Sequence, residues 1–161
     1  MASSLQKSVS NRIVIVRNTP AVQATPDYST GDLIGGKQEL INAVEESGAA
    51  GIIRGITVAD AANQKIQIDA IFFNADPSNT TFTENGALAV NAADLDKIIG
   101  AVVVGTYFAF NANAFGQPSG AVRIPFVLGG GTSLFLALIA RGTINLAATT
   151  DLDVRVALER S

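Results

Sequence analysis

The stretch DLDVRVALE (residues 151–159) alternates apolar and polar side chains in a regular way. In an extended chain the apolar residues would lie on one side: Leu152, Val154, Val156 and Leu158. The charged residues Asp153, Arg155 and Glu159 would lie on the other side. A period of two is typical of a β-strand with one buried face, whereas a helix repeats its apolar positions about every 3.6 residues. This C-terminal stretch therefore predicts a half-buried strand.

A second alternating stretch, QKIQIDAIFF (64–73), predicts a strand with Ile66, Ile68, Ala70 and Phe72 inside. Further runs rich in β-branched and aromatic residues predict strands at 13–16, 51–58, 101–108, 122–128 and 133–142. Segments rich in Gly, Pro, Asn and Ser separate these runs. About eight short strands with almost no long helix favour an all-β sandwich or barrel.

Three segments leave more than one interpretation or lack a pattern. ELINAVEES (39–47) has apolar spacing that suits a helix, but the flanking glycines favour a strand with a bulge. The stretch beginning at Asp94 predicts one or two helical turns with Asp94 as the N-cap. Residues 1–11 show no periodicity, so we expect an extended N-terminal arm followed by one β-sandwich domain over 12–161.

The composition is apolar, with 48% hydrophobic and only 16% charged residues. An average soluble domain has roughly 25% charged residues. The predicted strands at 101–104 and 134–139 are apolar on both faces, so their outer faces must be covered by the chain itself or by a neighbouring subunit. Together these features predict a homo-oligomer or a component of an assembly.

The stretch GDLIGGK (31–37) contains the spacing of a P-loop, Gly31 followed by Gly36 and Lys37. A working P-loop needs a strand before it, a helix after it, and Ser or Thr after the lysine to hold Mg²⁺. Here a turn-like segment precedes the motif and Gln38 follows the lysine. We therefore predict a turn at Gly31 and, at Gly35 and Gly36, either a β-bulge or a close backbone approach within a strand, and expect Gly36→Val to damage folding.

The chain has no histidine and no cysteine, which excludes His-based catalytic triads, thiolate chemistry and the usual zinc sites. Two Asp-Leu-Asp pairs, Asp94 with Asp96 and Asp151 with Asp153, could begin a calcium site. A helix cap and solvated strand polarity explain them more simply. A hydrolase that uses carboxylates alone stays open, because the fold could bring distant acids together. We predict that the protein is not an enzyme and holds no cofactor or metal.

The 11 basic residues are scattered and the net charge is −3, which disfavours nucleic-acid binding. The most apolar run, residues 134–140, is far shorter than the ~20 residues of a membrane helix, so no membrane partner is expected. Residues 108–120, FAFNANAFGQPSG, predict a long loop with three phenylalanines. Phe108, Phe110 and Phe115 either tuck into the core beneath this loop or dock onto a neighbour, and they are the candidate partner contacts.

Several stretches together resemble the head decoration, or cement, proteins of tailed bacteriophages. They are DYSTGDLIGG (27–36), GIIRGITVAD (51–60), IDAIFFNADPSNTTFTENGALAV (68–90), DLDKIIGAVVV (94–104) and FVLGGGTSLFLALIARGTINLAATTDLDVRVAL (126–158). The resemblance implies a jelly-roll-like β-sandwich that binds the major capsid protein on the outer surface of the phage head, often as a trimer. It also implies assembly in the bacterial host cytoplasm and offers no catalytic residues to carry over.

An alternative function is a virion-borne binding module, an adhesin that recognises glycans on the host surface. The chain has no tryptophan and two tyrosines, so it is poorly supplied with sugar-stacking side chains. The leading prediction is therefore a structural virion protein that stabilises a phage head.

Overall fold

The structure is a computed structural model that describes residues 12–160; the predicted arm at 1–11 and Ser161 lie outside the described residues. The described chain forms ten strands and one short 3₁₀ helix, η1. In chain order these are β1 (Arg12–Asn18), β2 (Leu33–Leu40), β3 (Ala50–Asp60), β4 (Ile68–Phe73), η1 (Ala92–Lys97), β5 (Ile98–Val104), β6 (Thr106–Phe110), β7 (Asn113–Gln117), β8 (Ile124–Val127), β9 (Leu134–Ala140) and β10 (Leu152–Arg160).

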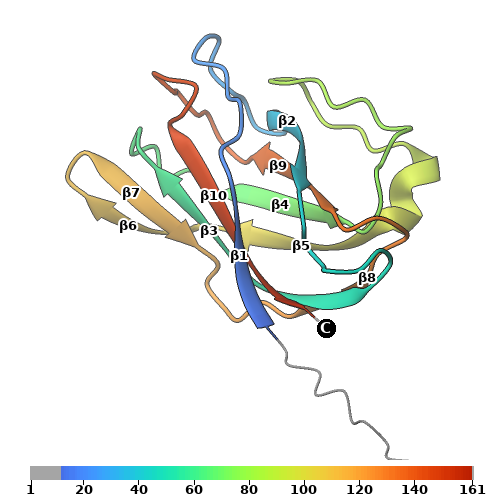
Figure 1. The fold of residues 1–161 in the computed structure, drawn as a ribbon. Coiled ribbons are helices and arrows are strands. Elements are labelled where there is room, and N and C mark those ends of the chain that lie inside the picture. The colour runs from blue at the N-terminus through green and yellow to red at the C-terminus, as the bar shows by residue number, and fades with distance from the viewer. Residues whose placement is uncertain (1–11, 161) are drawn as a thin grey trace, which may run out of the picture.

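The strands form two antiparallel sheets that pack face to face (Figure 1). The large sheet has the order β1-β10-β3-β7-β6, and β8 also pairs with β3. The small sheet has the order β2-β9-β4-β5. The prediction of an all-β sandwich is confirmed, whereas the finer jelly-roll assignment stays a prediction.

The core between the sheets is built from the residues that the alternation places inside. On β10 the four predicted inward side chains are at most 2% exposed, and on β4 Ile68, Ala70 and Phe72 are equally buried. They belong to one continuous apolar cluster to which strands of both sheets contribute. The period of two therefore predicted the inward face of both strands correctly.

The outer face of the small sheet is covered largely by the chain itself. In a second apolar cluster, Phe82, Leu88 and Val90 pack on the outer side of the sheet, where Phe73 and Ala137 are fully buried. The rings of Phe73 and Phe82 meet edge to face with centroids 6.2 Å apart. This covering explains why the run at 134–139 can be apolar on both faces without a neighbouring subunit.

The predicted single strand at 101–108 is wrong. The chain breaks at Gly105, so β5 lies in the small sheet and β6 in the large sheet. The predicted long loop at 108–120 is also wrong, because residues 106–117 form the β6–β7 hairpin with Phe108 directly opposite Phe115. A continuous apolar run gives no indication of where a chain leaves one sheet for the other, which explains the first error, and the small polar residues among the phenylalanines explain the second.

Three local predictions also need correction. Residues 39–47 form a strand only at Glu39 and Leu40, and turns follow to residue 48. β4 begins at Ile68 instead of residue 64, because Lys65 has a φ of +55° that interrupts an extended chain. The N-cap of η1 is Asn91, whose side chain accepts a hydrogen bond from the Ala93 N–H at 2.9 Å, and the predicted cap Asp94 is instead buried.

Candidate interaction surface

The glycine-rich stretch that resembles a P-loop forms part of a β-strand. Gly31 lies in a turn, and Gly35 and Gly36 have φ values of +74° and +65° at a register shift between β2 and β9. The predicted turn and bulge are therefore confirmed. Lys37 forms an ion pair with Asp76 at 2.6 Å and lies 5.7 Å from the centre of the Phe135 ring. A strand follows the glycines in place of the helix that a phosphate-binding loop requires.

Three of the four carboxylates in the two candidate calcium pairs, those of Asp94, Asp151 and Asp153, are bonded to other groups of the protein. Asp151 accepts hydrogen bonds from the backbone N–H groups of Ala147 and Ala148 at 2.8 and 2.9 Å. Asp153 accepts bonds from two arginines. Within residues 12–160 no three acidic side chains lie close enough together to hold a metal ion. The same part of the chain has no helix with the length and apolarity needed to cross a membrane.

Asp94 is the centre of a buried polar network that fixes the segment between β4 and β5. Its carboxylate accepts hydrogen bonds from Asn79 at 3.0 Å, Thr80 at 2.7 Å and Lys97 at 2.8 Å. Burial by itself would raise the pKa of this carboxyl, but the bonds from Lys97, Thr80 and Asn79 outweigh it and hold the pKa well below its usual range. The network is satisfied internally, so it offers no free group to a ligand.

Both tyrosines of the chain are used inside the fold. Tyr28 is fully buried, and its hydroxyl donates to Glu84 and accepts a bond from the Gln23 N–H at 2.8 Å. The Tyr107 hydroxyl donates to the Ile66 carbonyl at 2.7 Å. Burial raises the pKa of both hydroxyls above the usual tyrosine range. The Tyr28 ring is therefore inaccessible, and the Tyr107 ring is half-buried.

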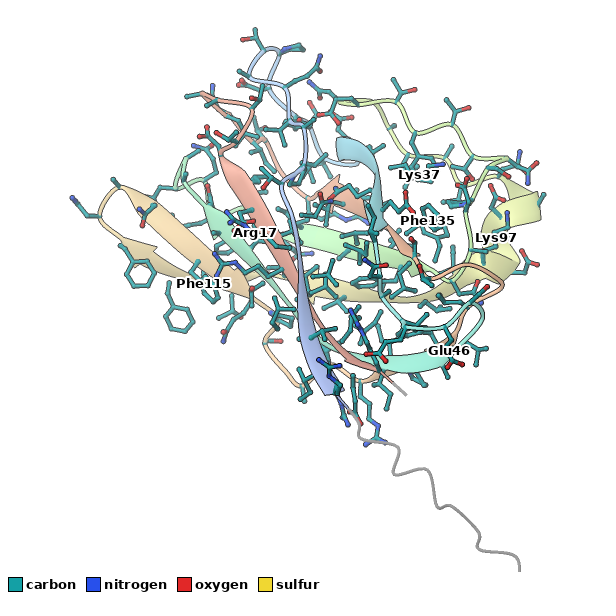
Figure 2. The ribbon with its side chains drawn as sticks, viewed as in Figure 1. Arg17, Lys37, Glu46, Lys97, Phe115 and Phe135 are labelled. Carbon is teal, nitrogen blue, oxygen red and sulfur yellow. The ribbon has the colours of Figure 1, made fainter. Side chains whose placement is uncertain are left out.

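The structure brings the three predicted contact residues together on one face of the β6–β7 hairpin. Phe108 lies opposite Phe115, and Phe110 follows two positions along β6 on the same face. Phe108 and Phe110 are 51% and 60% exposed, and Phe115 is half-buried. The interpretation in which these rings tuck into the core is therefore wrong for Phe108 and Phe110. Figure 2 shows Phe115 on the projecting hairpin, on the other side of the molecule from Lys37.

The phenylalanines belong to a larger apolar surface, which we call the outer face: the side of the large sheet that points away from the small sheet. Register places Phe115 opposite Ala59 and Ala59 opposite Asp153, which lies on the outward side of β10. The outer face also carries the most exposed aliphatic side chains of the large sheet. These are Ile13 (67% exposed), Ile15 (60%) and Val127 (60%).

A charged row crosses the outer face between its apolar ends. The Arg17 Nε donates to Asp153 at 2.7 Å, and an Arg155 nitrogen donates to the same carboxylate at 3.1 Å. Arg54 and Glu159 form a second ion pair. Figure 2 shows Arg17 on β1 near the centre of this view. Because the row holds three arginines and two carboxylates, it neutralises most of its own charge and keeps a small positive excess.

The outer face is hollowed in three places. A hollow of about 470 Å³ lies between Ile15, Gly55, Ala157 and residues 117–122. A second, of about 440 Å³, lies over Ile52 and the paired strand β8. A third, of about 300 Å³, lies beside Phe110 and Phe115. Shallow hollows beside exposed aromatic and aliphatic side chains suit a broad protein surface better than an enclosed small ligand.

The chain matches no protein-family model and no curated protein sequence. The assignment of the outer face as a candidate interaction surface therefore depends only on the residues of this chain.

Sequence reasoning found the phenylalanines of this surface but missed its other members. The sequence predicts strands at 13–16 and 122–128 but does not indicate which face of them Ile13, Ile15 and Val127 occupy. The alternation within RIVIVR (12–17) separates Ile13 and Ile15 from Val14 and Val16. However, both halves of that alternation are apolar, so the sequence does not indicate which half points outward.

Proposed function

We propose that the protein is a non-enzymatic structural protein that binds a large protein assembly through the outer face. The observation that carries this proposal is the concentration of exposed apolar side chains there: Ile13, Ile15, Phe108, Phe110 and Val127. Exposed apolar side chains gathered on one face of a protein often mark a surface that a partner covers. Exposed aromatic residues are frequent anchors of protein interfaces.

The proposed assembly is the head of a tailed bacteriophage, and the proposed partner is its major capsid protein. The resemblance of the sequence to head decoration proteins supports this choice, and so does the form of the surface. A capsid presents the same broad surface many times, so a modest contact repeated over the particle stabilises it strongly. The protein would then be located on the outside of the virion head.

The features of the outer face favour a protein partner over the other classes considered. Arg17, Arg54 and Arg155 are each paired with a carboxylate, so they are not arranged to follow a phosphate backbone. Both tyrosines are bonded within the fold, which leaves phenylalanine as the exposed aromatic residue of this face. Nothing in the structure favours glycan recognition over capsid binding, so we propose only the latter.

The test is co-sedimentation of the purified full chain with undecorated phage capsids. We expect the unaltered protein to sediment with the capsids and the double variant Phe108→Ser, Phe110→Ser to remain in the supernatant. Leu95→Ser is the matched control, because Leu95 is 54% exposed on η1, away from the outer face. It should bind like the unaltered chain.

All three proteins should unfold at similar temperatures, because the substituted side chains are exposed. Absence of the unaltered protein from the capsid pellet would refute the capsid proposal. Equal binding by the double variant would show that the outer face is not the docking surface.

A further inference from the structure

The edges of the two sheets differ in how well they are protected from pairing with another strand. Sheet edges in monomeric proteins are normally blunted by bulges, lysines, prolines or a covering segment. In the small sheet, β2 is interrupted by the bulge at Gly35 and Gly36 and carries Lys37. The other edge strand, β5, is flanked by residues 118–124: the two segments line one hollow, and a Cβ at Gly100 would lie 3.0 Å from the Ile124 side chain. Both edges of the small sheet are thus protected.

Among the residues that the structure describes, β1 shows no bulge, lysine or proline, and its two arginines, Arg12 and Arg17, lie near its ends. β1 pairs with β10 along all seven of its residues without a bulge. Within the described chain, no backbone group of β1 is bonded to any other segment. Its centre, residues 13–16, contains only isoleucine and valine. Ile13 and Ile15 are the two most exposed side chains of the strand's apolar run. Figure 1 shows β1 alongside β10 at the rim of the sandwich.

We propose that β1 pairs with β1 of a second copy of this chain, antiparallel and about a two-fold axis at Ile15. This register places all seven residues of the strand opposite a residue of the partner strand. Val14 then faces Val16 of the other copy, and Ile13 faces Arg17, whose charge is already neutralised by Asp153. No like charges are opposed. A two-fold axis at Val14 or Val16 would pair only five of the seven residues, and an axis between two residues is excluded because it would set an inward side chain opposite an outward one.

The other bare edge, β6, is a poorer candidate for the same role. It has five residues, against seven for β1. Its strand pairing within the described residues is with β7 alone, which itself pairs with β3 over three residues. An edge at the end of a projecting hairpin is less rigid than one backed along its full length by a central strand. The β1 edge is therefore the better template for main-chain pairing.

Pairing through β1 joins the two large sheets into one and places the two outer faces side by side. A dimer would present each binding surface twice, which increases the strength of attachment to a repetitive assembly without any new contact. The pairing itself does not depend on the proposed capsid partner. It gives a two-fold dimer, in contrast to the trimer that the family resemblance implies.

The sharpest test uses a single introduced cysteine, because the chain contains none. The proposed register sets position 15 opposite position 15 of the other copy, with Cα atoms about 4.5–5.5 Å apart. Disulfides form across Cα separations of about 4.4–6.8 Å. Ile15→Cys should therefore form a covalent dimer on mild oxidation. Ile13→Cys is the matched control, because its two copies would lie about 13 Å apart.

Light scattering on the unoxidised full chain should give twice the monomer mass. Ile15→Lys should raise the dissociation constant of the dimer about tenfold or more, because it places two like charges opposite each other at the two-fold axis. Val103→Lys, at an exposed valine on β5, should leave the dimer intact. A monomer at about 100 µM, a trimer, or a covalent dimer from Ile13→Cys or Phe108→Cys equal to that from Ile15→Cys would each overturn the proposal.

These measurements need no capsid, so they separate this inference from the proposed function. The double variant Phe108→Ser, Phe110→Ser should remain a dimer even though it no longer binds capsids. Failure of capsid binding with intact dimers would therefore refute the proposed function alone.

Discussion

Two adjacent glycines in β2 allow backbone strain to be separated from steric overlap in one experiment. Gly35 and Gly36 both have positive φ, which costs an L-residue with a side chain about 1–2 kcal/mol. At Gly36 an added Cβ would meet nothing within 4 Å. At Gly35 it would lie 2.3 Å from the Pro20 Cβ and 3.1 Å from the Pro20 Cα. A proline is rigid, so this overlap adds a packing cost of about 1–3 kcal/mol.

We therefore expect Gly36→Ala to lower the free energy of unfolding by about 1–2 kcal/mol and Gly35→Ala to lower it by about 2–5 kcal/mol. Urea unfolding followed by far-UV circular dichroism measures both. With a slope of about 2 kcal/mol per molar urea, the midpoints should fall by about 0.5–1 M and 1–2.5 M respectively, with unchanged slopes.

Gly36→Val should cost more than Gly36→Ala, because a β-branched residue tolerates positive φ least well. Equal losses for the two alanine variants would refute the reasoning, because they would show that Pro20 does not confine this bulge. A loss of stability in Gly36→Ala with none in Gly35→Ala would refute the predicted overlap with Pro20 more strongly.

Two further outcomes concern ionisable groups in the fold. The pKa of the Asp94 carboxyl is lowered in the folded protein, so its contribution to stability is present above the unfolded value of about 3.9 and is lost as pH falls further. The stability deficit of Asp94→Asn, measured by urea unfolding, should thus shrink below about pH 4; a deficit that stays constant would contradict the assignment. The hydroxyl pKa values of Tyr28 and Tyr107 are raised by burial, so their contribution is present below about pH 10 and is lost as pH rises through the folded pKa. Absorbance near 295 nm should show no tyrosinate before the protein unfolds in base, and a tyrosine titrating near pH 10 in the folded protein would refute this.

The candidate surface was only partly predictable from the sequence. Three phenylalanines in a polar stretch indicated either burial or contact with a partner, and the sequence left the two equally open. What decided the outcome was the pairing of Phe108 with Phe115 in a hairpin, with Ala114 buried on the opposite face. Ile13 and Ile15 could not be assigned to a face, because both sides of their strand are apolar.

The sequence by itself determined the local features: the period of two on β4 and β10, their inward residues, and the glycine turn and bulge around Gly31–Gly36. These features depend on the conformational preferences of residues that are close together in the sequence. A short stretch therefore contains the information needed to predict them. Only the tertiary structure decided that the run from 98 to 110 divides between two sheets, and that residues 82–90 cover the small sheet while Ile13, Ile15 and Phe108 on the large sheet stay exposed within residues 12–160. Sheet membership and covering depend on which distant residues bury one another, and an apolar run on both faces of a strand is compatible with several such partners.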